Sequence, residues 1–230
     1  MKTVIKTFRL PLLPAIAIVL IALISLVLIR QQLMVEPALS PSLFGKIAII
    51  DPGHGDWDPG VVGINGIKEK DINLAIAKNL AEMLRNSGAT VLMTRENDTI
   101  KATSKSEDTK ARAALAEGAD VFISIHANSF PAAPNSHGAQ IFYGTDNLQG
   151  KKLAELIQKQ TGQHLNSTRT ALSHKNAYLL KNITIPAVIA EMGFLSNREE
   201  AQKLTTIDYQ WQAAWAVYLG IVDYFSAPLK

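Results

Sequence analysis

Five short segments of the chain carry side chains that could hold a catalytic metal ion. They read Asp-Pro-Gly-His-Gly at residues 51–55, Glu-Lys-Asp at 69–71, Ser-Ile-His-Ala-Asn at 124–128, His-Gly-Ala-Gln-Ile-Phe at 137–142 and Glu-Met-Gly-Phe-Leu-Ser-Asn at 191–197. The imidazoles of His54 and His126 and the carboxylate of Glu69 would supply three ligands to a zinc ion and leave a fourth position open for water. The chemistry of such a site is hydrolysis.

Each of these three residues also has a plainer explanation. His54 could be a structural residue in a turn, and His126 could be a buried histidine that is hydrogen-bonded to backbone. Glu69 could be a carboxylate that is favourably placed at the N-terminus of a helix. Three unrelated structural roles would then have to coincide at one place, so we favour metal binding.

Zinc suits this set of donors better than other metals. The chain contains no cysteine, so a metal site must use histidines and carboxylates. A zinc ion in such a site lowers the pKa of its bound water to about 7. Glu191 would take up the proton of that water and return it to the leaving nitrogen. The alternatives for Glu191 are a helix cap or an ion pair, and the Met-Gly that follows it argues against both.

Other polar residues could support this site or contact the substrate. Ser124 and Asn128 flank His126 and could hydrogen-bond to the metal ligands, although Asn128 could equally be a plain turn residue. Arg112 could reach a substrate carboxylate, but a structural ion pair is the better interpretation. His137 precedes a glycine at the start of a predicted strand and could line the cleft.

The elements around these segments alternate between strands and helices. Short apolar runs predict strands at residues 46–50, 90–93, 121–125, 139–143, 177–180 and 187–190. Apolar residues at helical spacing predict helices at residues 71–86, 110–117, 148–161, 198–204 and 209–225. This alternation implies an α/β fold with a largely parallel sheet covered by helices on both faces. Ligands bind outside the carboxyl ends of such strands, where Asp51, His126 and Glu191 are expected.

The charge of the chain lies in its N-terminal segment. The formal net charge is +3, and residues 1–40 carry all of this excess. The remainder of the chain is neutral, so it has no basic field with which to bind nucleic acid.

A long apolar run near the N-terminus predicts a membrane anchor. Residues 10–29 contain no charged side chain, and as a helix they would span about 30 Å, the thickness of the hydrocarbon core of a bilayer. Basic residues precede the run and only Arg30 follows closely, which places the N-terminus in the cytoplasm and the rest outside. The alternative is a cleaved signal peptide and secretion, with an unusually long apolar region. We therefore predict an anchor at residues 1–30, a linker at 31–44 and a catalytic domain at 45–227.

In their order along the chain, the segments at residues 51–55, 69–71, 124–128 and 191–197 resemble those of the zinc-dependent N-acetylmuramoyl-L-alanine amidases of the amidase 3 family. The resemblance extends from about residue 46 to residue 225.

The resemblance implies one zinc ion held by His54, Glu69 and His126, with Glu191 as the catalytic carboxylate. It also implies a mixed, mostly parallel six-stranded sheet flanked by helices. One departure is Asp56, which stands where the family usually has a second glycine. Aspartate tolerates a positive φ better than most residues, so the turn can still form.

The implied activity is hydrolysis of the amide bond between the lactyl group of N-acetylmuramic acid and L-alanine in peptidoglycan. Within the family, the chain resembles most the membrane-anchored, germination-specific type that acts on spore cortex. That type acts before a muramic-acid deacetylase, so functional coupling to such an enzyme is expected.

Two other functions compete with this one. A zinc exopeptidase acting on cell-wall peptides would be favoured by two closely spaced metals, whereas the sequence offers one full set of ligands. A wall-binding module without catalysis would have no need for all three ligands and Glu191.

Overall fold

The computed structural model describes residues 19–25 and 40–227 of the chain. The chain divides into two compact units, Met1–Ala38 and Leu39–Lys230. In the first unit, residues 19–25 are helical and expose apolar side chains. Within the described residues, no helix combines the length and the apolar character needed to cross a membrane. Most of the predicted anchor at residues 10–29 lies outside the described residues.

The second unit is built on a sheet of six strands in the order β2-β1-β3-β6-β4-β5. Their bounds are Ile47–Pro52 for β1, Thr90–Met93 for β2, Val121–Asn128 for β3, Gln140–Tyr143 for β4, Leu172–Ser173 for β5 and Ala187–Phe194 for β6. Strands β1, β2, β3 and β6 are parallel, and β4 runs antiparallel to β6 and parallel to β5. The mixed, mostly parallel six-stranded sheet is thus confirmed.

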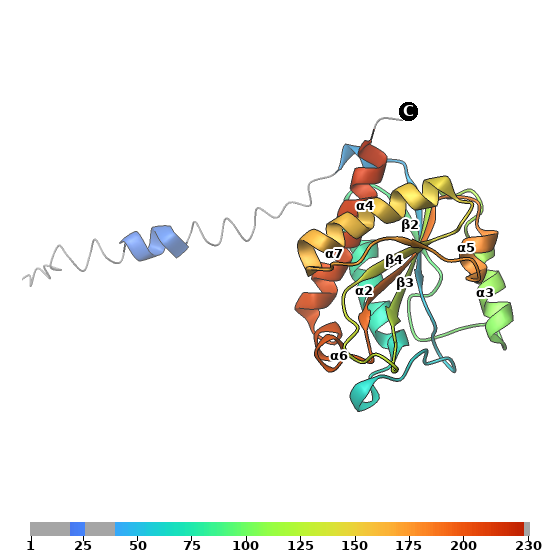
Figure 1. Cartoon of the computed structure of the whole chain (residues 1–230). Coiled ribbons are helices and arrows are strands. Elements are labelled where there is room, and N and C mark those ends of the chain that lie inside the picture. Colours follow the sequence, from blue (N-terminus) through green and yellow to red (C-terminus); the bar gives the residue numbers. More distant parts are fainter. Residues whose placement is uncertain (1–18, 26–39, 228–230) are drawn as a thin grey trace, which may run out of the picture. The chain divides into compact units, whose positions relative to one another are not determined.

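Helices cover both faces of this sheet (Figure 1). One face carries α2, Glu69–Asn86, α4, Leu148–Leu165, and α7, Ile207–Ser226. The other carries the shorter helices α3, Lys105–Ala114, and α5, Tyr178–Asn182. Helix α6, Arg198–Leu204, lies next to β6. The 3-10 helices η1, Pro41–Leu43, and η2, Ile64–Gly66, are in the connecting segments. Leu43 of η1 is fully buried, although residues 31–44 were predicted as a linker.

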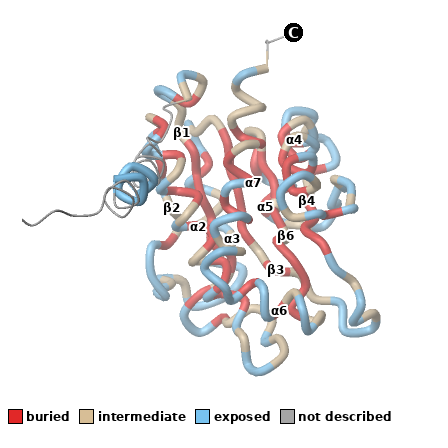
Figure 2. Tube along the Cα trace, turned by 90° about the vertical axis from the view of Figure 1, so that its left-hand side faces the viewer, coloured by how far each residue is buried: buried red, intermediate tan, exposed pale blue. Residues whose placement is uncertain are grey.

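Side-chain alternation along the strands produces two cores. Ile50, Ile123 and Ala190 point into the larger core, under α2, α4 and α7. Phe122 and Ala187 belong to the smaller core, under α3 and α5. The tube view shows the strands buried between exposed helical surfaces (Figure 2). Leu179 and Leu180 of α5 and Ala113 of α3 pack against this smaller core.

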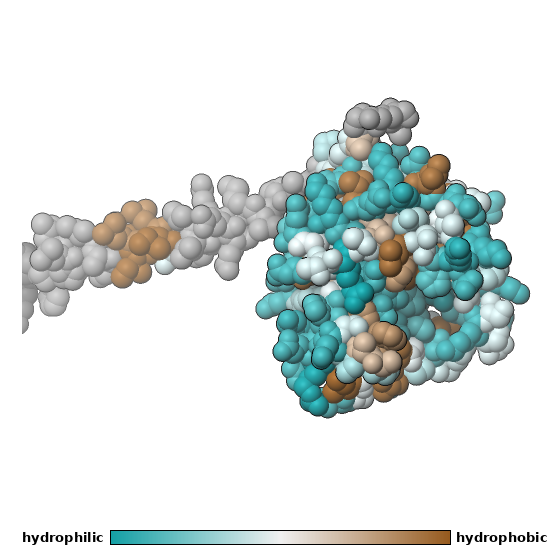
Figure 3. Space-filling view, in the orientation of Figure 1, coloured by the Kyte–Doolittle hydropathy of each residue, from teal (hydrophilic) through white to brown (hydrophobic). Residues whose placement is uncertain are grey.

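The surface of the domain in the view of Figure 3 is largely hydrophilic, with isolated apolar patches. The sheet and its helices enclose the apolar side chains, and the charged side chains, whose net charge in this part of the chain is zero, lie on the outside.

Most predicted elements are present, with extended ends, but three differ. The strand predicted at residues 177–180 is wrong, because this segment forms helix α5. A short apolar run does not distinguish a buried strand from a buried helix. Strand β5 has two residues and was not predicted. Helix α3 begins at Lys105 rather than at residue 110, because the Ser104 hydroxyl accepts a hydrogen bond from the backbone N–H of Glu107 and caps the helix.

Helices α4 and α7 approach closely where α7 has a glycine. A Cβ atom added to Gly220 would lie 2.5 Å from Cα of Ile157 in α4. The backbone of α4 cannot move away without disturbing the larger core, so a side chain at this position would separate the two helices.

We therefore expect Gly220→Ala to lower the free energy of unfolding by about 1–3 kcal/mol, as overpacked core positions do. Gln212→Ala, on the exposed side of the same helix, should change it by less than about 0.5 kcal/mol. Urea denaturation followed by circular dichroism measures both. Equal stability of the two variants would show that the contact between the helices is not tight.

Candidate metal centre

Three side chains from distant parts of the sequence meet at the carboxyl edge of the sheet. Nε2 of His54 lies 3.3 Å from Oε2 of Glu69, and Nδ1 of His126 lies 2.8 Å from Oε1 of the same carboxylate. One potential ligand atom from each residue falls within 4.8 Å of the other two. The imidazole rings are 5.0 Å apart and nearly perpendicular, with an interplanar angle of 80°. Two imidazoles and a carboxylate so arranged could hold one zinc ion.

His54 reaches this edge from a strained turn after β1. Its φ of 62° and the φ of 46° at Asp56 lie in the left-handed region, which is uncommon for residues other than glycine. The expectation that Asp56 tolerates a positive φ agrees with this conformation. Arg95 holds the turn, donating from Nε to the Pro52 carbonyl at 3.0 Å and from Nη2 to the Gly53 carbonyl at 3.1 Å. A strained turn next to a site requires such support from its surroundings.

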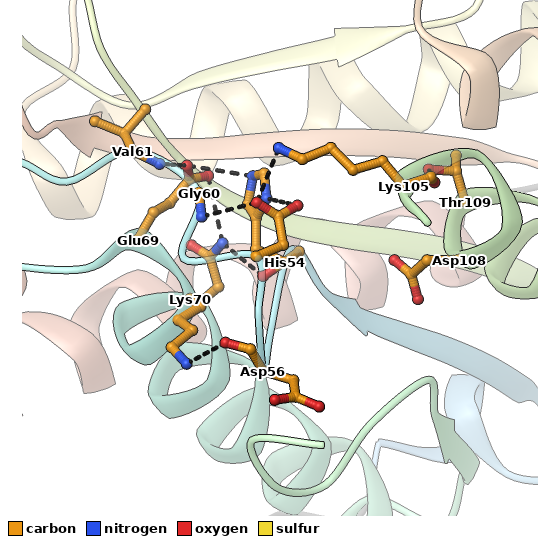
Figure 4. Close-up of polar contacts among 12 residues, drawn as sticks. His54, Asp56, Gly60, Val61, Glu69, Lys70, Lys105, Asp108 and Thr109 are labelled. Atoms are coloured by element: carbon orange, nitrogen blue, oxygen red, sulfur yellow. Dashed lines mark hydrogen bonds and ion pairs between the residues drawn. The ribbon is translucent and has the colours of Figure 1, made fainter. Parts of the chain in front are cut away.

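Glu69 is the first residue of α2, where a negative charge is favourable. Its Oε2 accepts a hydrogen bond from the Val61 N–H at 2.9 Å, and its Oε1 accepts one from the Ala127 N–H at 3.2 Å. Burial alone would raise the pKa of Glu69, but hydrogen bonds and attraction to His126 and His54 hold this pKa far below its usual range. The carboxylate is therefore ionised at neutral pH. Figure 4 shows Glu69 between His54 and the loop that contains Gly60 and Val61.

A second carboxylate orients His54 from behind. Oδ2 of Asp58 lies 2.9 Å from Nδ1 of His54, and Oδ1 of Asp58 lies 2.9 Å from Nζ of Lys105 on α3 (Figure 4). Burial lowers the pKa of His54, but the two carboxylates, Glu69 and Asp58, raise it above its ordinary value. A carboxylate on Nδ1 holds the ring so that Nε2 faces the site. Sequence analysis missed Asp58, although a carboxylate four residues after a histidine in one loop was a usable signal.

Glu191 lies on β6, directly beside His126 on β3. Burial, together with the charge of Glu69, raises the pKa of Glu191 to about 7, although His126 and His54 oppose the shift. Its Oε2 is buried without a hydrogen-bond partner among the described residues. A recessed carboxyl group whose pKa is near neutrality is suited to accept and donate a proton. Both residues were predicted at strand ends, but β3 and β6 continue to Asn128 and Phe194.

Ser124 and Arg112 belong to a buried cluster below the site. Ser124 donates a hydrogen bond to Oδ2 of Asp51 at 2.6 Å, and Nη1 of Arg112 lies 3.2 Å from the same atom. Burial would raise the pKa of Asp51, but Arg112, Ser124 and Thr94 lower it. These contacts join α3 to β1 and β3. Ser124 and Arg112 therefore bind Asp51, and neither contacts one of the three proposed metal ligands.

Asn128 and His137 have roles in turns. Oδ1 of Asn128 accepts a hydrogen bond from the Ser129 N–H at 2.7 Å, and its carbonyl accepts one from the Leu195 N–H at 2.7 Å. His137 is exposed, and its Nδ1 lies 2.9 Å from the carbonyl oxygen of Asn135. Both residues lie at the edge of the sheet that carries the site, without contacting its three central side chains.

A glycine lets the loop pass against two of the clustered side chains. A Cβ atom on Gly60 would lie 2.6 Å from Oε2 of Glu69 and 2.7 Å from Cδ2 of His54. Gly66, in the same loop, has a similar positive φ of 76°, against 68° for Gly60, but its Cβ would meet nothing within 4 Å. The two positions therefore share the backbone strain of an alanine and differ in whether the new methyl group enters the site.

We expect Gly60→Ala to lower the affinity of the protein for zinc by about tenfold or more, the scale on which groups behind metal ligands act. Gly66→Ala should leave this affinity within a factor of about two, while costing similar stability through its positive φ. Competition with a chromophoric chelator measures the affinity. Equal affinities of the two variants would show that the loop is not packed against the ligands.

Comparison with known proteins gives consistent matches. The family model described as N-acetylmuramoyl-L-alanine amidase matches residues 48–223. The germination-specific N-acetylmuramoyl-L-alanine amidase of Bacillus subtilis is 40% identical over 195 residues, which cover 80% of this chain and 81% of that protein. The CwlD amidase of Clostridioides difficile, solved in complex with the GerS lipoprotein, is 37% identical with a TM-score of 0.76, over 79% of this chain and 99% of that one. The AmiC2 amidase of Nostoc punctiforme is 31% identical with a TM-score of 0.72, over 79% and 98% of the two chains.

Proposed function

The chain belongs to the N-acetylmuramoyl-L-alanine amidase family, and we propose that His54, Glu69 and His126 hold one zinc ion while Glu191 carries the proton. The enzyme hydrolyses the amide bond between the lactyl group of N-acetylmuramic acid and L-alanine in peptidoglycan. The observation that carries the proposal is the convergence of two imidazoles on the Glu69 carboxylate, with the unpartnered Oε2 of Glu191 on the neighbouring strand.

The donor set supports zinc. Nε2 of His54 faces Glu69 because Asp58 occupies the other ring nitrogen. The ionised Glu69 supplies a hard anionic oxygen, and the chain has no thiolate that would favour a softer metal. Zinc in such a site polarises a carbonyl group and lowers the pKa of water.

Glu191 supplies the proton transfers. Its carboxylate accepts a proton from the attacking water, and its carboxyl form then donates the proton to the departing nitrogen of L-alanine. A pKa near 7 suits both steps, because the group exchanges its proton at the pH of the reaction. The buried Oε2 has no competing donor among the described residues, so it is available to the reacting water.

We expect Glu191→Gln to retain zinc at one ion per chain and to lose at least about a hundredfold in rate, the usual scale of acid–base catalysis. Glu155→Gln, on the exposed side of α4, should keep full activity. Elemental analysis measures the metal, and release of new L-alanine amino groups from purified peptidoglycan measures the rate. A Glu191→Gln enzyme with undiminished rate would contradict the assigned role.

The same assay separates the amidase from the competing functions. An amidase releases L-alanine amino termini without new reducing ends of sugar. A zinc exopeptidase would instead release free amino acids from the ends of the stem peptides, and a wall-binding module would release nothing.

The substrate we propose is spore-cortex peptidoglycan, because the relative from Bacillus subtilis is named germination-specific. Functional coupling to a muramic-acid deacetylase would follow from this role. The solved complex of the CwlD amidase with a lipoprotein supports a lipoprotein partner for this chain as well. The neutral charge of the domain argues against nucleic acid as a partner.

The location that we propose is the cell membrane, with residues 1–30 as a single anchor, residues 31–44 as a linker and the catalytic domain, residues 45–227, outside the cytoplasm. The uncharged run at residues 10–29 and the basic residues before it support this arrangement. The apolar side chains exposed on residues 19–25 also require a covering environment.

We expect the full chain to sediment with membranes and to require detergent for extraction, whereas a chain without residues 1–38 should be soluble and active. Fractionation followed by mass determination tests this. A soluble product of the full gene that has lost its first residues would show signal cleavage and secretion instead.

A further inference from the structure

Three side chains form a row across the sheet at the catalytic edge. His126 on β3 pairs with Glu191 on β6, and Glu191 pairs in turn with Gln140 on the antiparallel strand β4. Residues directly opposite one another on adjacent strands point to the same face. The row therefore leads from the proposed metal site, through the proton carrier, toward β4 and β5.

Arg169 stands next in this row. Its Nη1 donates a hydrogen bond to Oε1 of Gln140 at 3.0 Å. Gln140 is itself held by a hydrogen bond from its Nε2 to the Thr170 carbonyl at 3.1 Å. The guanidinium thus lies one side chain beyond Glu191, on the side away from His126.

The position of the guanidinium is set by two further contacts. Its Nε donates to the His137 carbonyl at 2.7 Å, and its Cζ lies 4.5 Å from the ring centre of Phe194. None of these contacts with Arg169 involves a carboxylate. Within the described part of the chain, Arg169 has no carboxylate at ion-pair distance, and its Nη2 has no hydrogen-bond partner.

An arginine held in this way is arranged for an anion that the protein does not itself provide. A planar guanidinium with a free edge binds a carboxylate through two parallel hydrogen bonds, and prior immobilisation reduces the entropy lost on binding. A residue that only braced a loop would gain nothing from an unpaired charge.

We propose that Arg169 binds a carboxylate on the peptide side of the substrate. This inference rests on the proposed function and extends it to substrate orientation. The lactyl carboxyl group is consumed in the scissile amide, so a free carboxylate near this bond belongs to the peptide. The stem peptide then runs from His126 and Glu191 toward β4 and β5, and the glycan lies on the side of His54.

The distances are compatible with this assignment. Neighbouring strands lie about 4.7–4.9 Å apart, so Gln140 is about one strand spacing from Glu191. An extended peptide advances about 3.3–3.6 Å per residue. The guanidinium is therefore within reach of a carboxylate on one of the first few residues after L-alanine.

The test compares substrates that differ only in the charge of the peptide. N-acetylmuramoyl peptides with two to five stem residues are prepared with all carboxylates free or with all converted to carboxamides. For at least one length, wild-type enzyme should favour the free acid in kcat/KM by about tenfold or more, the scale of a charge-assisted hydrogen bond. Arg169→Gln should remove this preference by slowing hydrolysis of the acid while leaving that of the amide within about twofold.

Two further variants keep the test decisive. Arg85→Gln, at the far end of α2, should preserve the acid-to-amide ratio of the wild type. Arg169→Lys keeps the positive charge but loses the planar guanidinium, so it should show an intermediate acid-to-amide ratio. This variant replaces Arg169→Gln in the test if Arg169→Gln does not fold.

Each outcome has one meaning. Equal hydrolysis of acids and amides by the wild type, or an equal loss on both substrates in Arg169→Gln, would overturn the inference and leave the amidase activity intact. Failure of the wild type to cleave any of the substrates would overturn the proposed function itself.

Discussion

The arrangement of the site depends on one ionised carboxylate, Glu69, held between two imidazoles. This buried side chain would be unstable as an anion without the donors that surround it. His54 approaches it from the turn after β1 and His126 from β3, and the backbone N–H groups of Val61 and Ala127 complete its hydrogen bonds. Because Glu69 begins α2, the helix, the strained turn and the sheet must all reach their final positions before this environment exists.

The rest of the domain can be understood as support for that convergence. Arg95 holds the carbonyls of the turn that carries His54, and Asp51 joins β1, β3 and α3 through Ser124 and Arg112. The short helices α3 and α5 cover the smaller core, and Lys105 at the start of α3 also contacts Asp58, the carboxylate behind His54. In the row from His126 to Gln140, His126 and Glu191 are partly accessible, whereas Gln140 is buried.

Much of this arrangement could be predicted from local patterns. Buried parallel strands leave continuous apolar runs, so the strands that carry His126 and Glu191 were identifiable, and polar residues at their ends indicated the site. Helix α5 was not identifiable, because its two buried leucines, Leu179 and Leu180, fit either secondary structure. The supporting residues were missed for another reason: Arg95 and Arg169 act on groups more than twenty residues away, and no local pattern records such contacts.

Two polar groups that lack a partner among the described residues lie close together at the carboxyl edge of the sheet. Buried polar atoms without partners are uncommon, because such an atom loses its hydrogen bonds with water and gains none in the protein, which costs free energy. Oε2 of Glu191 is such an atom, and the guanidinium of Arg169, one side chain further along the row, has no counter-ion among the described residues. Glu191, the proposed proton carrier, and the guanidinium of Arg169 lie on one face of the sheet and together set the direction in which a substrate would extend. They favour a ligand that brings an amide to Glu191 and a negative charge to Arg169, which a peptide attached to a sugar acid can do and a bare glycan cannot.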